Sequence, residues 1–272
     1  MRVHHLNCGT MCPHGGKLIG TPGGWLDPGR MICHCLLVET NDGLVLVDTG
    51  IGTADVADPQ RQLGRAFVAI TRPQLDHEET ALAQIRALGY TADDVRHIVV
   101  THLDLDHAGG LPDFPRAKVH VHAREHAAAM HPALRERARY RRPHFAHRPD
   151  WVLHHEDGER WFGFDAVRAL PGAGDDVLLV PLHGHTRGHA GVAVRAEDGW
   201  LLHCGDAYFF HRELDEPPYC PPGLTLFQNL VQVNRDQRLA NQQRLRELAR
   251  EQKGTVRLFS AHDPVELARF GG

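Results

Sequence analysis

The sequence has little cysteine, no long hydrophobic run and no excess of charge of either sign. Six cysteines in 272 residues are too few for a disulfide scaffold, and their spacings match no zinc-ribbon pattern. We therefore expect reduced thiols and a cytoplasmic location. No stretch approaches the length that spans a bilayer, and no apolar signal-peptide core follows Met1, so neither a membrane association nor a secretion signal is expected.

The charge and the composition exclude some partners and leave one anomaly. The formal net charge is −4, close to balance for this length, and no basic groove with interleaved aromatic residues is visible. Such a groove is what nucleic-acid binding needs, so no nucleic-acid partner is expected. The anomaly is histidine, with 22 residues. No single site needs that many, so the question is which of them lie where a metal ion can gather them.

Apolar periodicity predicts strands and helices in both halves of the chain. Strands are predicted over residues 31–39, 44–48, 98–101, 118–121, 177–182, 190–194, 200–204 and 256–260. Helices are predicted over 75–88, 123–130 and 234–252, the last with Leu239, Leu245 and Leu248 facing inward. The arginine-rich segment 135–148 has no clear period and is interpreted as a solvated face. No linker or repeat divides the chain, so residues 1–272 are predicted to form one domain.

The segment Thr101-His102-Leu103-Asp104-Leu105-Asp106-His107-Ala108-Gly109-Gly110 carries the strongest chemical signal. It follows a predicted buried strand, and four candidate metal ligands alternate there with apolar anchors. Imidazole suits zinc, iron and manganese, whereas carboxylates suit harder ions and can bridge two metals. We interpret this segment as a metal-binding loop at the end of a strand, because strand, ligands and the Gly-Gly exit coincide.

This segment resembles the His-x-His-x-Asp-His signature of the metallo-β-lactamase superfamily, with one substitution. Four further elements in the same order resemble that superfamily's landmarks: Asp48-Thr49-Gly50, Gly184-His185-Thr186-x-Gly188-His189, Cys204-Gly205-Asp206 and Ser260-Ala261-His262-Asp263. The resemblance spans residues 31–263. It implies a four-layer αβ/βα sandwich of the α/β (α+β) class, in which two mixed sheets pack together with helices outside.

The resemblance also implies a ligand set for two metal ions. One ion would be held by His102, Asp104, His185 and Asp206. The other would be held by Asp106, His107, Asp206 and His262, so that Asp206 bridges the pair. Alone, His185 or His262 would be interpreted as a hydrogen-bonded surface residue, and Asp206 as a turn residue after a strand. Their common placement at strand ends favours the metal site.

Asp104 departs from the pattern, because most of the superfamily has histidine there. A carboxylate is a harder ligand and adds negative charge, which shifts the metal preference towards iron or manganese. Two zinc ions are the first expectation, with iron or manganese as the alternatives. We expect Asp104 to be a direct metal ligand.

The implied chemistry is hydrolysis by a metal-bound hydroxide. Asp106 is expected to orient the nucleophile and pass a proton to the leaving group, with Asp48 and His189 fixing the ligands' orientation. Tyr208, just after the bridging Asp206, is a candidate for assisting the substrate's carbonyl oxygen. The glycine-rich segment 20–29 is a candidate wall of the metal-site mouth.

Among superfamily members, the chain is most similar to small-molecule hydrolases, and especially to the lactonases. The expected substrate is therefore a lactone or a related ester, and the expected assembly is a monomer or homodimer. A glyoxalase-II-like thioesterase is one alternative. Another is an iron-dependent oxidoreductase that resembles the persulfide dioxygenases, and Asp104 keeps it open.

Overall fold

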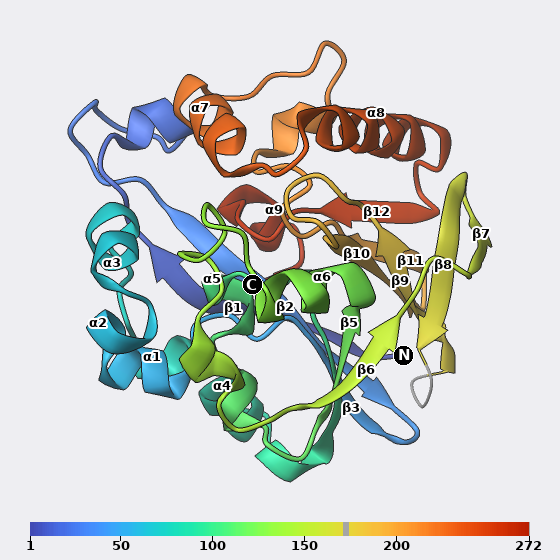
Figure 1. The fold of residues 1–272 in the computed structure, drawn as a ribbon. Helices are drawn as coiled ribbons and strands as arrows, with labels where there is room; N and C mark the ends of the chain where they lie inside the picture. The colour runs from blue at the N-terminus through green and yellow to red at the C-terminus, as the bar shows by residue number, and fades with distance from the viewer. Residues whose placement is uncertain (171–173, 272) are drawn as a thin grey trace.

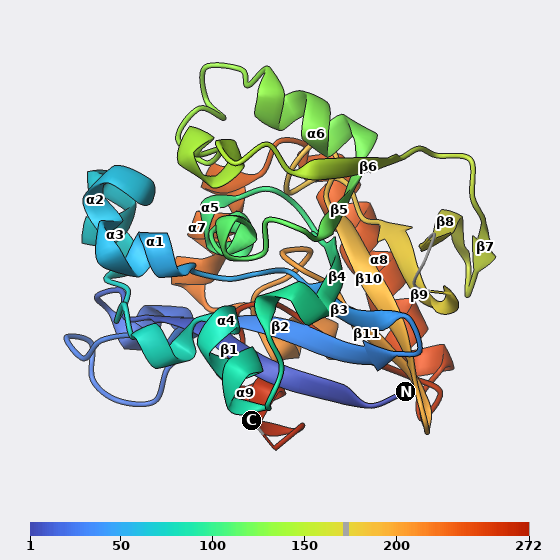
Figure 2. The ribbon, with the colours of Figure 1, turned by 90° about the horizontal axis from the view of Figure 1, so that it is seen from below.

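Two six-stranded β-sheets pack face to face, and helices cover both outer faces (Figures 1 and 2). This computed structural model describes residues 1–170 and 174–271. The first sheet contains, in spatial order, β1 (Val3–Met11), β2 (Met31–Thr40), β3 (Gly43–Val47), β4 (Val95–Val99), β5 (Lys118–His122) and β6 (Asp150–His154). The second contains β12 (Val256–Phe259), β11 (Gly199–His203), β10 (Ala190–Ala196), β9 (Gly174–Pro181), β8 (Phe164–Leu170) and β7 (Glu159–Trp161).

The helices fall into short connecting turns and longer covering helices. The α-helices are α1 (Thr53–Ala57), α2 (Pro59–Gln62), α3 (Arg65–Thr71), α4 (Ala81–Ala87), α5 (Leu105–Ala108), α6 (Ala123–Met130), α7 (Pro222–Val231), α8 (Arg235–Glu251) and α9 (Pro264–Ala268). The 3₁₀ turns are η1 (Gly16–Ile19), η2 (His77–Glu79), η3 (Ala92–Asp94), η4 (Leu111–Asp113), η5 (Arg142–Phe145) and η6 (His211–Leu214). None of the helices described is both long and apolar enough to cross a membrane.

Three apolar clusters fill the three interfaces between the four layers. Side chains of β2 alternate between two of these clusters. Leu37 packs outward with Ile85 of α4, whereas Leu36 packs inward between the sheets. On the other side, Leu202 of β11 packs with Leu245 of α8. The predicted αβ/βα sandwich is therefore confirmed.

Strand direction decides where the loops that carry the candidate ligands meet. The pairs β3–β4, β4–β5 and β11–β12 are parallel, so the carboxyl ends of these strands point to the same edge of their sheets. In open α/β sheets, this edge is where ligands bind. Asp48, the segment 101–107, Asp206 and His262 all follow these strand ends.

Most predicted elements are present, and the departures have local causes. The helix predicted over residues 75–88 is α4, which begins at Ala81 because the Thr80 side chain caps it by accepting a hydrogen bond from Ala83 N. Leu75 instead has a positive φ of 56°. In α8, Leu245 is buried as predicted, but Leu239 is 37% exposed, so its inward prediction is wrong. The strands β1, β6, β7 and β8 were not predicted.

Candidate metal centre

Four loops and the short helix α5 bring the seven predicted ligands to one sheet edge. They come from the β4–α5 loop and α5, the β9–β10 loop, the β11–η6 loop and the β12–α9 loop: His102, Asp104, Asp106, His107, His185, Asp206 and His262. Apart from Asp106, all of them are buried. Residues separated by as many as 160 positions therefore form one cluster.

His102, Asp104 and His185 form one half of the cluster, here called the first pocket. Asp104 Oδ2 lies 3.1 Å from His185 Nε2 and 3.5 Å from His102 Nε2. Ligating atoms of all three residues lie within 4.8 Å of one another. Two imidazoles and a carboxylate thus point into one space.

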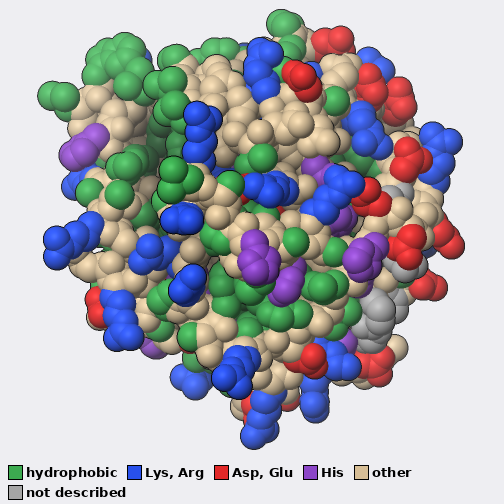
Figure 3. Space-filling view, viewed as in Figure 1, with side chains coloured by type: hydrophobic (Ala, Val, Ile, Leu, Met, Phe, Trp, Pro, Cys, Tyr) green, Lys and Arg blue, Asp and Glu red, His purple; other side chains and the backbone are tan. Residues whose placement is uncertain are grey.

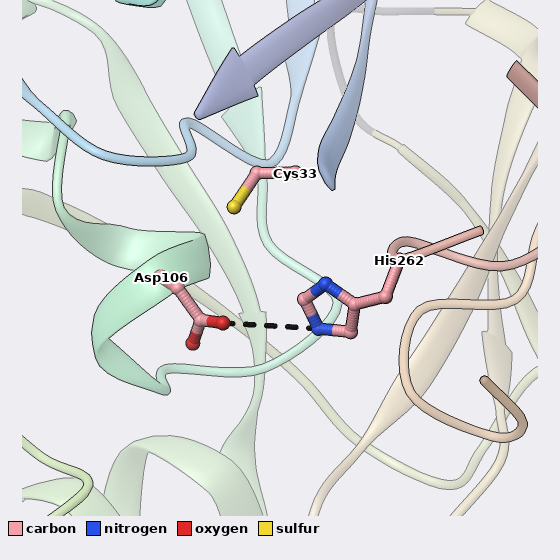
Figure 4. Close-up of side chains that lie close together, drawn as sticks. All are labelled: Cys33, Asp106 and His262. Atoms are coloured by element: carbon pink, nitrogen blue, oxygen red, sulfur yellow. Dashed lines mark ion pairs between the residues drawn. The ribbon is translucent and has the colours of Figure 1, made fainter. Parts of the chain in front are cut away.

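Asp106, His107 and His262 form the other half, here called the second pocket. His107 Nε2 and His262 Nε2 are 3.4 Å apart, and Asp106 Oδ2 lies 3.7 Å from His262 Nε2. Figure 4 shows Asp106 and His262 facing each other, with Cys33 above them.

Asp206 lies between the two pockets and turns one oxygen to each. Its Oδ2 is 3.4 Å from His185 Nε2 in the first pocket. Its Oδ1 is 3.1 Å from His262 Nε2 and 3.2 Å from His107 Nε2 in the second. This is the arrangement that a carboxylate bridging two cations requires.

The charges and the unpaired atoms of these side chains suit bound metal ions. Three carboxylates converge here, those of Asp104 and Asp206 buried, and their like charges repel unless cations neutralise them. Within the described chain, His102 Nε2 and Asp206 Oδ1 are buried without a hydrogen-bond partner. Such orphaned atoms in a polar cluster point to an ion that satisfies them.

The imidazoles are oriented by hydrogen bonds to their other ring nitrogen. His107 Nδ1 donates to Asp48 Oδ2 over 2.8 Å, and His262 Nδ1 donates to the carbonyl oxygen of Ile32 over 2.7 Å. Asp48 is held in turn by the backbone N–H and the hydroxyl of Thr101, both at 2.7 Å. Each Nε2 is thereby directed at the pockets, as is usual for metal-binding histidines.

His102 and Asp206 are positioned by the same kind of contact. The Thr101 hydroxyl donates to Asp48 and so accepts from His102 Nδ1 at 2.9 Å. His189 Nε2 accepts from the backbone N–H of Asp206 at 2.9 Å. Gly205, the residue before Asp206, has φ +53°, and a Cβ there would lie 2.6 Å from His189 Nε2. Only glycine fits this turn without strain.

The cluster is strongly coupled electrostatically. Burial alone would raise the pKa of Asp206, but the imidazoles of His262, His107 and His185 outweigh burial and hold that pKa well below its usual range. Burial likewise opposes the charge on His107, yet Asp206 and Asp48 raise the pKa of His107 well above its usual value. The metal-free cluster therefore holds protons, which leave when a cation binds.

Arg139 neutralises the unusual carboxylate in the first pocket. Its Nε lies 3.2 Å from Asp104 Oδ1, and its two other nitrogens donate to the carbonyl oxygens of His185 and Val231. Burial opposes ionisation of Asp104, but Arg139 and His102 outweigh it and hold the pKa of Asp104 well below its usual range. Asp104 thus presents Oδ1 to Arg139 and Oδ2 to the pocket. The interpretation of segment 135–148 as a solvated face is wrong at this residue.

Glu125, at the start of α6, ties the two ligand loops together. Its buried carboxylate accepts hydrogen bonds from Leu103 N and Tyr140 Oη, both at 3.1 Å. It also accepts from Thr186 Oγ1 at 2.6 Å and Gly188 N at 3.0 Å. One side chain therefore joins the loop of His102 and Asp104 to the loop of His185.

Glu125→Gln tests this connection. The amide places two donors against groups that already donate, and each unsatisfied buried group costs about 1–3 kcal/mol, so we expect a loss of about 2–4 kcal/mol in the free energy of unfolding. Urea denaturation of the metal-free protein measures it. Glu78→Gln, in an 85% exposed side chain, is the matched control. A change below about 0.5 kcal/mol in Glu125→Gln, the level of ordinary surface substitutions, would show that this carboxylate does not hold the loops.

The structure does not bring Tyr208 to the pockets. Its side chain is fully buried, and its hydroxyl donates to Glu266 over 3.0 Å. A hydroxyl in that position cannot contact a substrate, so the predicted role of Tyr208 is not supported. The next residue, Phe209, reaches the site instead: its ring stacks on His262 with 5.2 Å between centroids.

The model of the metallo-beta-lactamase superfamily matches residues 28–244. The chain belongs to this superfamily. A probable metallo-hydrolase of Mycobacterium tuberculosis is 48% identical over 99% of this chain and 83% of that protein. An N-acyl homoserine lactonase of Bacillus thuringiensis is 27% identical over 88% of this chain and 85% of that protein.

Solved structures agree on the metallo-β-lactamase fold. A mutant of B. thuringiensis AiiA with N-decanoyl-L-homoserine bound at its active site has a TM-score of 0.74 and 20% identity, over 98% of this chain and 95% of that one. A dizinc quorum-quenching lactonase, AidC, has a TM-score of 0.66 and 17% identity, over 96% and 87%. The family-model match and the relative at 48% identity confirm the predicted superfamily and its metallo-hydrolase activity.

Proposed function

We propose that this metallo-β-lactamase-fold hydrolase opens the ring of a small-molecule lactone, or cleaves a related ester, that carries an apolar tail. The observation that carries the proposal is the placement of Asp206, which turns one carboxylate oxygen to each of two His/Asp pockets. Zinc is the metal we propose for both. When bound, such a pair lowers the pKa of a coordinated water to about 7 and polarises a carbonyl oxygen.

Asp106 is the residue best placed to handle the proton. Its side chain is 15% exposed, more than those of Asp206 at 6% or His107 at 2%, so it lies on the solvent side of the cluster. Its carboxylate orients the attacking water, accepts the proton and returns it to the leaving alkoxide oxygen. The imidazoles of His102, His107 and His262, fixed by their Nδ1 contacts, keep their ligand atoms in place while the substrate binds.

An apolar wall beside the pockets supports a substrate with a tail. From His262 the ring of Phe209 leads to Phe227 on α7, with 5.4 Å between their centroids. Leu226 and Leu230 on the same helix are exposed, as are Leu18, Trp25 and Leu26 in the N-terminal loop. Figure 3 shows hydrophobic side chains gathered at the upper left, over this loop and α7. We propose that the predicted loop wall and α7 together bind the tail.

A substrate panel tests the proposal. Zinc-loaded protein is assayed with N-acyl homoserine lactones of increasing chain length, an unsubstituted γ-lactone, an aryl ester and a glutathione thioester. We expect kcat/KM to be highest for lactones and to rise with tail length, by roughly threefold or more per buried CH₂ at about 0.8 kcal/mol each. Faster turnover of the thioester, or no lactone hydrolysis, contradicts the proposal.

Phe227→Ala examines the tail-binding wall separately. It is expected to flatten the dependence on tail length while leaving the unsubstituted lactone unaffected. Leu239→Ala on α8 is the matched control, since both side chains are 37% exposed. Equal effects of the two substitutions would show that α7 does not bind the tail.

A further inference from the structure

Cys33 lies at the second pocket but is not among the seven predicted metal ligands. It is a free cysteine on β2 and only 2% exposed. Its Sγ, a carboxylate oxygen of Asp106 and a ring nitrogen of His262 all lie within 4.8 Å of one another (Figure 4). Zinc lies about 2.3 Å from a sulfur ligand and about 2.0–2.2 Å from nitrogen or oxygen, so these three atoms need to draw closer by roughly 1–2 Å to share one ion.

β2 holds this thiol in place through the residues on either side of it. The carbonyl oxygen of Ile32 accepts the hydrogen bond from His262 Nδ1 at 2.7 Å, and His34 N donates to the carbonyl oxygen of Ala261 over 2.8 Å. The segment that orients His262 therefore also delivers Cys33 to the same pocket. A change in the position of one would move the other.

The buried atoms of the cluster point to an ion in this space. Asp206 Oδ1, which faces the second pocket, is one of the buried atoms without a hydrogen-bond partner in the described chain. It lies 3.1 Å from His262 Nε2, so the carboxylates of Asp206 and Asp106 and the Cys33 thiol approach His262 together. A cluster of this composition is a zinc-type donor set, with imidazole, carboxylate and sulfur.

We propose that Cys33 is a further ligand of the metal ion in the second pocket. On binding, its S–H bond breaks, the proton leaves to solvent and a sulfur–metal bond forms, with no change in oxidation state. This inference rests on the two-metal centre proposed above. It goes further, because it makes the pockets chemically unequal: the first offers the hard carboxylate of Asp104, and the second offers soft sulfur. Zinc should therefore fill the second pocket first.

Spectroscopy of the cobalt(II)-loaded protein tests the bond directly. A thiolate bound to cobalt(II) gives a near-ultraviolet charge-transfer band, which we expect in the unmodified protein and in Cys35→Ser but not in Cys33→Ser. Cys35 is the matched control, because it is a free, buried cysteine on the same face of β2. Zinc titration should show the tighter site weakened by at least about 100-fold in Cys33→Ser, beyond the 10–100-fold typical of removing an outer partner.

X-ray absorption at the zinc edge needs no variant, so it tests the sulfur–metal bond even if Cys33→Ser does not fold. The unmodified protein should show a sulfur shell at about 2.3 Å beside nitrogen and oxygen at about 2.0–2.2 Å. Two bound zinc ions with only nitrogen and oxygen neighbours would overturn the role of Cys33 and leave the two-metal centre intact. Failure to bind any metal would overturn the centre itself.

Discussion

Replacing Asp206 by alanine is expected to remove the pair of metal ions and to lower kcat/KM by more than about 10³-fold, which is ~4 kcal/mol of transition-state stabilisation. The reason is geometric. Asp206 Oδ2 lies 3.4 Å from His185 Nε2, and Asp206 Oδ1 lies 3.1 Å from His262 Nε2, so one substitution takes a ligand from both pockets. Metal content after dialysis and turnover of the preferred substrate are the two measurements.

Asp206→Asn separates loss of the bridge from loss of the side chain. The amide keeps the shape and one oxygen, so one pocket retains a weak ligand. We expect about one metal ion per chain and little activity, since hydrolysis needs both. Full metal content and turnover in Asp206→Ala would contradict the assignment of Asp206 as the bridging residue.

The second large effect is expected at Asp104. Asp104→Ala removes a first-pocket ligand and leaves Arg139 buried without its carboxylate partner. Leaving one member of a buried ion pair alone costs about 3–5 kcal/mol, so the metal-free variant should be strongly destabilised. Zinc affinity at the first pocket should fall while the second pocket stays filled. Calorimetric titration and urea denaturation measure the two effects.

Asp104→His tests whether the family's usual ligand can be restored. The effect of this substitution depends on Arg139, whose Nε lies 3.2 Å from Asp104 Oδ1. A histidine at position 104 would leave the buried guanidinium without that carboxylate acceptor. We expect Asp104→His alone to leave zinc affinity at the first pocket unimproved. Together with Arg139→Met it should raise that affinity by about tenfold or more, which a double-mutant cycle resolves. If no Asp104 variant changes stoichiometry or affinity, Asp104 is not a ligand and a single-metal enzyme becomes the better account.

The ligands were predictable because each lies in a short motif at a strand end. His102, Asp104, Asp106 and His107 occur within six residues after a buried β-branched strand, so local sequence places them together. Parallel strands then bring Asp206 and His262 to the same edge. Spacing marks residues 102–107 as a metal-binding loop, and the resemblance to the metallo-β-lactamase superfamily supplies the rest of the predicted ligand set.

Other residues of the site gave no such signal. Arg139 is one of several arginines in an aperiodic segment, and only the fold shows that it alone reaches Asp104. Glu125 is an acidic residue in an ordinary helix, made unusual by the four donors that surround its carboxylate. Cys33 alternates with Cys35 on a strand face, and nothing in the sequence distinguishes them.

Tyr208 illustrates the limit of reasoning from position. In the turn after Asp206, a difference of one residue decides which ring points at the pockets. Phe209 takes that place, while Tyr208 turns into the core against Glu266, whose pKa burial raises to about 8. The sequence predicts that this turn lies beside the metal pockets. The direction of each side chain, however, depends on the packing of α8 and α9 around the turn.

We propose two metal pockets that share Asp206, one formed by His102, Asp104 and His185 and the other by Asp106, His107 and His262. Elemental analysis of protein purified without added metal, combined with anomalous diffraction from its crystals, tests this claim most directly. We expect two metal ions per chain, one in each pocket with Asp206 between them. A single ion, or none in protein that retains full hydrolytic activity, would contradict it.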